Sequence, residues 1–262
     1  MTAAYLQEYA PIFYVLAGIL GLMLGSFMNV VVYRLPRKLS VVRPRSFCPR
    51  CRRAIPWYEN IPVASYVILR GRCRGCGAPI SARYPIIEGA GGALAVLAVA
   101  RFGFTLDALI AYAFLMALLA ITIIDWEFRI IPDEISIPFI AIGIAWAALG
   151  PGRTILDACL GALAAGGGLW AIAALYKLVR HEEGLGGGDV KLMAMVGACL
   201  GLKLVLVVLL LGSFAGTVYG LALMRSGKTA RTAVAFGSFL APAAAVSLLV
   251  GTRILAWYFS AF

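Results

Sequence analysis

Long apolar runs separated by short polar gaps dominate this chain of 262 residues. We distinguish eight runs, at about 11–33, 85–100, 105–124, 135–149, 155–179, 189–202, 204–224 and 233–259. Most of them approach the roughly 20 residues that a helix needs to cross about 30 Å of hydrocarbon. Because 62% of the residues are hydrophobic and only 13% are charged, an ordinary soluble domain is excluded. The sequence therefore predicts an all-α polytopic membrane protein with about eight transmembrane helices.

Basic residues gather in alternate gaps between these runs. The chain has 23 Lys and Arg against 12 Asp and Glu, which gives a net charge of +11. The first, third, fifth and seventh gaps, with their helix edges, hold 19 of the 23 basic residues, so the positive-inside rule places these gaps in the cytoplasm. Membrane orientation thus accounts for the basic charge, and we expect no nucleic-acid partner.

Four cysteines lie in the one sizeable polar segment, residues 34–84, between the first two runs. They form two CxxC pairs with 21 residues between them: Cys48, Cys51, Cys73 and Cys76. Each CxxC turn presents two thiolates to one side of a tetrahedral ion, and four thiolates saturate zinc, so the spacing predicts a structural zinc site in a small cytoplasmic insert. Disulfides or unrelated buried thiols are the alternative, which a reducing cytoplasm disfavours.

Two aspartates stand at the ends of apolar runs. Asp125 follows the run 105–124, and Asp189 follows a glycine cluster at the start of the run 189–202. Carboxylates at membrane depth are costly and usually mark a functional site. From Asp189 to Lys203 a helix spans roughly 21 Å, less than the hydrocarbon thickness, so we expect Asp189 below the cytoplasmic surface. Two carboxylates brought together in a wet cavity can do acid and base work in the manner of an aspartic protease.

Spacing alone leaves other interpretations of these aspartates open. Asp125 could be an interfacial acid paired with Arg129, and Asp189 could cap its helix beside Lys191. A proton- or ion-coupled transporter would use membrane carboxylates equally well. A membrane-anchored zinc module that only binds partners would not need them. Lys191 faces the same region as Asp189, which favours an electrostatic supporting role for this lysine.

Four blocks of sequence, in this order, carry a resemblance to a known family. They are GSFMNVVVYRLP at 25–36, the two CxxC pairs followed by RYPIIE, DWEFRIIPD at 125–133, and GGGDVKL at 186–192. AFGSFLAPA at 235–243 is a weaker fifth match, with Ser238 where the family more often has proline. The set resembles the bacterial type IV prepilin peptidases, GxGD-type membrane aspartic proteases that are also N-methyltransferases.

This resemblance implies roles for individual residues. Asp125 and Asp189 would be the catalytic pair, supported by the GxGD glycines Gly186 and Gly188, while Asp133 would be structural. One carboxylate would take a proton from water as the water attacks a peptide carbonyl, and the other would protonate the carbonyl oxygen. The implied substrates are prepilins and pseudopilins, cleaved after the glycine that ends the leader, at the cytoplasmic face. The new N-terminal residue would then be methylated with S-adenosylmethionine.

The resemblance also implies three segments. Residues 1–33 would form the first transmembrane helix, residues 34–84 a zinc-binding insert linked to methyl transfer, and residues 85–262 a seven-helix peptidase domain. The insert lacks a recognisable glycine-rich nucleotide-binding loop, so no residue is assigned to S-adenosylmethionine. We expect a multi-pass protein of the bacterial inner membrane, in contact with the bilayer, with the insert and the active site facing the cytoplasm.

Overall fold

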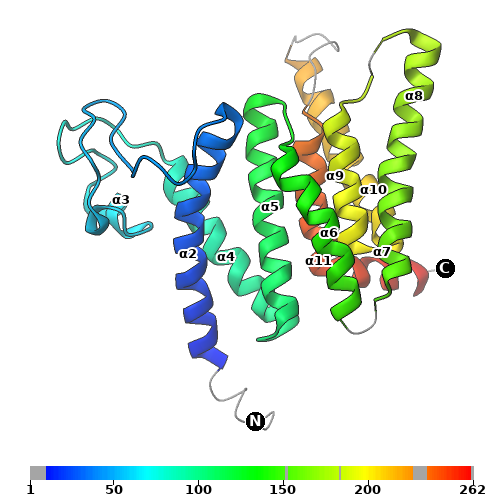
Figure 1. The fold of residues 1–262 in the computed structure, drawn as a ribbon, viewed down its shortest axis with the longest axis horizontal. Coiled ribbons are helices and arrows are strands. Elements are labelled where there is room, and N and C mark those ends of the chain that lie inside the picture. The colour runs from blue at the N-terminus through cyan, green and yellow to red at the C-terminus, as the bar shows by residue number, and fades with distance from the viewer. Residues whose placement is uncertain (1–9, 151–152, 183, 227–234, 261–262) are drawn as a thin grey trace. The chain divides into compact units, whose positions relative to one another are not determined.

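A computed structural model describes residues 10–150, 153–182, 184–226 and 235–260. Within these ranges the secondary structure consists of helices, without a β-strand (Figure 1). It forms two compact units, residues 1–112 and 113–262. The first nine residues of the predicted segment 1–33 and the first two of the run 233–259 lie outside the described ranges.

Each of the eight apolar runs forms a helical segment. In chain order these are α2 (Ala10–Arg34), α4 (Arg83–Phe102), α5 (Leu106–Phe128), α6 (Asp133–Leu149), the continuous series α7 (Ile155–Ala162), η3 (Leu163–Gly167) and α8 (Gly168–Arg180), then α9 (Gly187–Leu200), α10 (Leu202–Arg225) and α11 (Gly237–Ser260). Among the described residues, six segments are long and apolar enough to cross a membrane, whereas α6 and α9 are shorter, with 17 and 14 residues. The predicted class, an all-α polytopic membrane protein, is confirmed.

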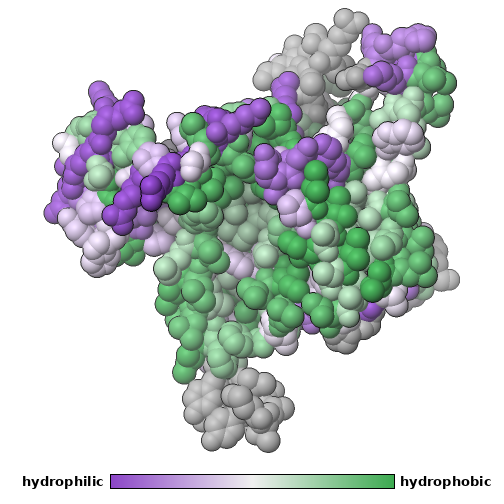
Figure 2. All heavy atoms as spheres, viewed as in Figure 1, coloured by the Kyte–Doolittle hydropathy of each residue, from purple (hydrophilic) through white to green (hydrophobic). Residues whose placement is uncertain are grey.

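In the first unit, α2 and α4 pack against each other (Figure 1). Glycines lie at this contact. A Cβ atom added to Gly25 would lie 2.8 Å from the Cα atom of Glu88, and one added to Gly91 would lie 2.9 Å from the Cα atom of Gly25. Small residues at such a contact let helix backbones approach closely in lipid. Large apolar side chains on α2 stay exposed, as on a lipid-facing helix (Figure 2): Ile12, Val15, Leu20 and Met23.

The insert between α2 and α4 consists of loops with three short helices, η1 (Leu35–Arg37), η2 (Trp57–Glu59) and α3 (Ala64–Ile68). One buried polar side chain ties the insert to α4, and a second joins α2 to the start of α4. Glu88 on α4 accepts a hydrogen bond from the Val63 N–H at 2.7 Å, and Asn29 on α2 donates one to the Tyr84 carbonyl at 3.2 Å. The insert is thereby held at the ends of α2 and α4.

In the second unit, α9 is the central helix, in contact with α6, α7, η3, α10 and α11. Leu192, Met193, Met195 and Val196 are all fully buried, which is typical of a helix that is apolar on every side. Glycines on the surrounding helices allow the close approach. A Cβ atom on Gly143 of α6 would lie 2.8 Å from the carbonyl carbon of Ala198. The apolar packing around α9 fixes the position of its first turn, which carries Asp189.

Candidate active site and metal centre

Asp125 lies near the C-terminal end of α5 and is 5% exposed. Its carboxylate oxygen Oδ2 accepts two hydrogen bonds from Ser238, one from the backbone N–H at 2.6 Å and one from the side-chain Oγ at 2.9 Å. Ser238 is the second residue of α11. The free N–H groups at a helix N-terminus bind anions well, which explains why a buried carboxylate is stable here.

Asp189 is the third residue of α9 and is half-buried. Its carboxylate faces the backbone N–H groups of Gly237 and Gly186, and the charge of Asp125 acts on it. Gly186 is the N-cap of α9, and Asp189 in the first turn lies near its N–H group. This arrangement resembles the acidic half of a capping box. Because Gly237 and Ser238 are consecutive, the first turn of α11 brings the two carboxylates to adjacent N–H groups.

Glycines make room for this arrangement. A Cβ atom on Gly237 would lie 3.0 Å from Asp125 Oδ2 and 2.8 Å from Ile131 Cδ1. One on Gly188 would lie 3.1 Å from Ile131 Cβ, whereas one on Gly186 would make an ordinary contact of 3.4 Å with Asp189 Oδ2. The tightest positions are therefore Gly237 and Gly188, which both pack against Ile131.

Lys191, expected to support Asp189, has its direct partner elsewhere. Its Nζ donates to both carboxylate oxygens of Asp133, each at 2.7 Å. Both side chains of this ion pair are about half exposed, at 44% and 51%, so the pair adds little stability. It joins the first residue of α6 to the fifth residue of α9.

The four predicted cysteines form one cluster in the insert. Their sulfur atoms all lie within 4.8 Å of one another, with Cys48 and Cys76 3.9 Å apart and Cys51 and Cys73 4.0 Å apart. Four thiolates at about 2.3 Å from a tetrahedral zinc ion would be about 3.8 Å apart. All four are free thiols rather than disulfides, and their arrangement fits a tetrahedral ion.

Backbone N–H groups prepare this cluster for a cation. The N–H groups of Cys51 and Arg50 lower the pKa of the Cys48 thiol to about 6. The N–H of Ala78 acts in the same direction on Cys76, but burial and the neighbouring thiols outweigh it and raise the pKa of Cys76 to about 11. A bound cation would favour the thiolate form of every cysteine in the cluster.

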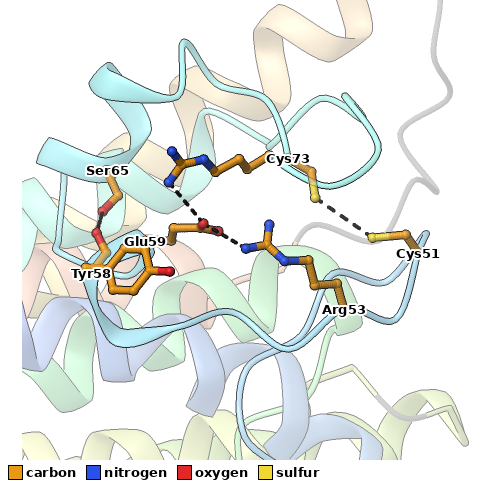
Figure 3. Close-up of polar contacts among 7 residues, drawn as sticks. Cys51, Arg53, Tyr58, Glu59, Ser65 and Cys73 are labelled. Carbon is orange, nitrogen blue, oxygen red and sulfur yellow. Dashed lines mark hydrogen bonds and ion pairs between the residues drawn. The ribbon is translucent and has the colours of Figure 1, made fainter.

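Glu59 connects the two halves of the cluster and has a role that the sequence analysis missed. Its carboxylate pairs with Arg53 at 2.9 Å and with Arg74 at 3.5 Å (Figure 3). Arg53 follows the first CxxC pair and Arg74 lies inside the second. The available signal was that Glu59 is the one acid in the strongly basic segment 34–84. The sequence also did not indicate that Gly237 and Ser238 lie against the aspartate carboxylates. Both residues lie in the segment 235–243, which is the weakest of the sequence matches to the family.

Comparisons with known proteins agree with these features. Residues 19–102 match the bacterial peptidase A24 N-terminal domain, and residues 112–221 match the type IV leader peptidase family. No solved structure matches the chain significantly.

Curated relatives match over most of their length, and each is named prepilin leader peptidase/N-methyltransferase. The protein from Burkholderia pseudomallei (strain 1026b) is 40% identical, over 89% of this chain and 84% of its own. Those from Aeromonas hydrophila and Pseudomonas aeruginosa are 36% and 34% identical, over 96% and 97% of this chain and 95% and 96% of their own. The chain therefore belongs to the type IV leader peptidase family, and it is an enzyme of the aspartic protease class.

Proposed function

We propose that this protein removes the leaders of prepilins and pseudopilins with Asp125 and Asp189 as its catalytic pair. The observation that carries the proposal is the placement of both carboxylates at the adjacent N–H groups of Gly237 and Ser238. Family membership supports the substrate class, because the relatives named above are prepilin leader peptidases.

The proposed reaction needs two carboxylates that share one proton. The ionised carboxylate takes a proton from water as the water oxygen attacks the carbonyl carbon of the scissile bond. The protonated carboxyl gives its proton to the carbonyl oxygen. When the carbon–nitrogen bond breaks, the leaving amine takes a proton from the first carboxyl, and the second recovers one from the tetrahedral intermediate. Like charges so close cannot both remain ionised, which keeps one proton on the pair.

The alternating basic gaps support a cytoplasmic position for this site in the inner membrane. Substrates with an apolar helix in the bilayer and a basic leader in the cytosol suit such a site. The bond cleaved would be the peptide bond on the C-terminal side of the glycine that ends the leader. Holding the substrate helix in the bilayer would reduce the entropic cost of positioning the scissile bond.

The four-cysteine cluster is the proposed site of a structural zinc ion. Cys48, Cys51, Cys73 and Cys76 would hold it, and four thiolate ligands leave no open position for chemistry. Bound zinc would supply folding energy to an insert with few buried apolar residues. We also propose that this insert, residues 34–84, serves N-methylation of the cleaved product with S-adenosylmethionine. The helix 1–33 would anchor it, and residues 85–262 would carry the peptidase.

The test uses purified protein in liposomes with a prepilin substrate. Mass spectrometry should detect loss of the leader, and a further gain of one methyl group when S-adenosylmethionine is added. Asp125→Asn should abolish cleavage, while Glu134→Gln, which removes an exposed charge in the first turn of α6, should leave it unchanged. Ion flux that depends on Asp125, without any cleaved product, would favour a transporter instead.

A further inference from the structure

Ser238 makes the environments of the two aspartates unequal. Both of its donors, N–H and Oγ–H, bind the same oxygen of Asp125, Oδ2, at 2.6 and 2.9 Å. The hydroxyl also lies 3.3 Å from the Thr122 carbonyl, which is the longer and weaker of its two contacts. Ser238 is 6% exposed, so these hydrogen bonds are shielded from water.

Two donors on one oxygen favour the ionised form of a carboxylate. They also orient the group, since within the described part of the chain Oδ1 of Asp125 accepts no hydrogen bond. Burial opposes the ionised form of Asp125, whereas the two donors of Ser238 and, more weakly, the positive charge of Arg129 favour it. Oδ1 is therefore the oxygen that remains available to take a proton.

Asp189 lies in a different environment. The backbone N–H groups of Gly237 and Gly186 and the negative charge of Asp125 act on it, and within the described residues no side-chain hydroxyl donates to its carboxylate. Lys191, the nearest basic residue along α9, is paired with Asp133. The proton shared by the pair is therefore best placed on Asp189.

We propose that Ser238 is a positioning residue that makes Asp125 the general base and leaves Asp189 as the general acid. This inference rests on the proposed peptidase function. The proton of the attacking water moves to Oδ1 of Asp125, and the proton of Asp189 moves to the carbonyl oxygen of the scissile bond. On collapse of the intermediate, the proton on Asp125 moves to the leaving amine and Asp189 takes back a proton from a hydroxyl group of the intermediate, which regenerates the enzyme.

Ser238→Ala tests the proposal, because it removes the hydroxyl and keeps the backbone N–H. We expect kcat to fall about tenfold to a hundredfold, because one hydrogen bond to a charged group is lost. KM should be nearly unchanged. The acid limb of the pH profile of kcat/KM should move to higher pH, because an Asp125 with one donor fewer takes up its proton more readily. Ser238→Thr, which restores a hydroxyl, should recover most of the activity and the original acid limb.

Ser247→Ala is the matched control, since Ser247 is a buried serine on the same helix whose hydroxyl finds no hydrogen-bond partner among the residues that the structure describes. A Ser238→Ala enzyme with the wild-type pH profile would overturn the proposal, and so would a loss of rate equal at every pH. If Ser238→Ala fails to fold, the pH profile of Ser238→Thr is the test instead. The proposal requires that this variant keep the acid limb of the wild-type enzyme, and a shifted acid limb would overturn it. Cleavage by Asp125→Asn would instead overturn the peptidase function itself.

Discussion

The first turn of α11 approaches α5 so closely that Gly237 has no room for a side chain. A Cβ atom there would meet Asp125 Oδ2 at 3.0 Å and Ile131 Cδ1 at 2.8 Å. Gly237→Ala should therefore displace the N–H groups that hold both carboxylates. Because small misplacements of catalytic groups are costly, we expect cleavage to fall about a hundredfold.

Gly187→Ala is the control for that substitution, since a Cβ atom on Gly187 would meet nothing within 4 Å. Cleavage rates of the two variants, measured on protein with unchanged thermal stability, should differ strongly. Equal rates would show that the approach of α11 to Asp125 does not matter for activity.

Individual residues differed in how far the sequence could predict them. The cysteines were predictable because CxxC spacing defines a local ligand geometry, and they form one cluster. That Asp125 and Asp189 both lie near the first turn of α11 was not predictable from spacing, because it depends on how α5, α9 and α11 pack. The role of Ser238 was not predictable either, since serine near a helix start is common and its partner lies 113 positions away in the chain.

At the scale of elements, α9 depends on neighbours that approach its backbone closely. Gly161 on α7 packs against the backbone of Gly197 on α9, and a Cβ atom on Gly161 would also lie 3.0 Å from the carbonyl carbon of Gly201. Gly161→Ala should push α7 away from α9 and lower the free energy of unfolding by about 1 to 3 kcal/mol.

Thermal unfolding in detergent measures this effect. Gly167→Ala serves as its control, because a Cβ atom on Gly167 would meet nothing within 4 Å. An unfolding temperature of Gly161→Ala no lower than that of Gly167→Ala would contradict the packing described for α9.

Helix boundaries were predictable where composition changes sharply. The glycine cluster predicted the start of α9 near Asp189, and the structure begins this helix at Gly187. The π-helical turn η3 was not predicted, because residues 155–179 read as one uninterrupted apolar run. Its wider turn places Gly166 against Ala194 of α9, a contact that depends on tertiary packing.

At the scale of the whole molecule, the two proposed activities belong to different parts of the chain. The cysteine cluster lies in the unit 1–112, and both aspartates lie in the unit 113–262. A chelator that strips the proposed zinc ion, or Cys76→Ser, should therefore abolish methylation and leave leader cleavage close to that of the untreated protein. Mass spectrometry of the product distinguishes the two, since a cleaved product without a methyl group is expected. Equal loss of both activities would contradict this division.

Asp125 and Asp189 are proposed to act together on one peptide bond. The most direct test is single-turnover cleavage of a prepilin by Asp125→Asn, Asp189→Asn and the double variant, each shown to be folded. Residues that act as one unit are strongly non-additive, so we predict that each single variant loses all measurable cleavage and that the double variant is no slower. Substantial cleavage by either single variant, or losses that add in the double variant, would contradict the claim.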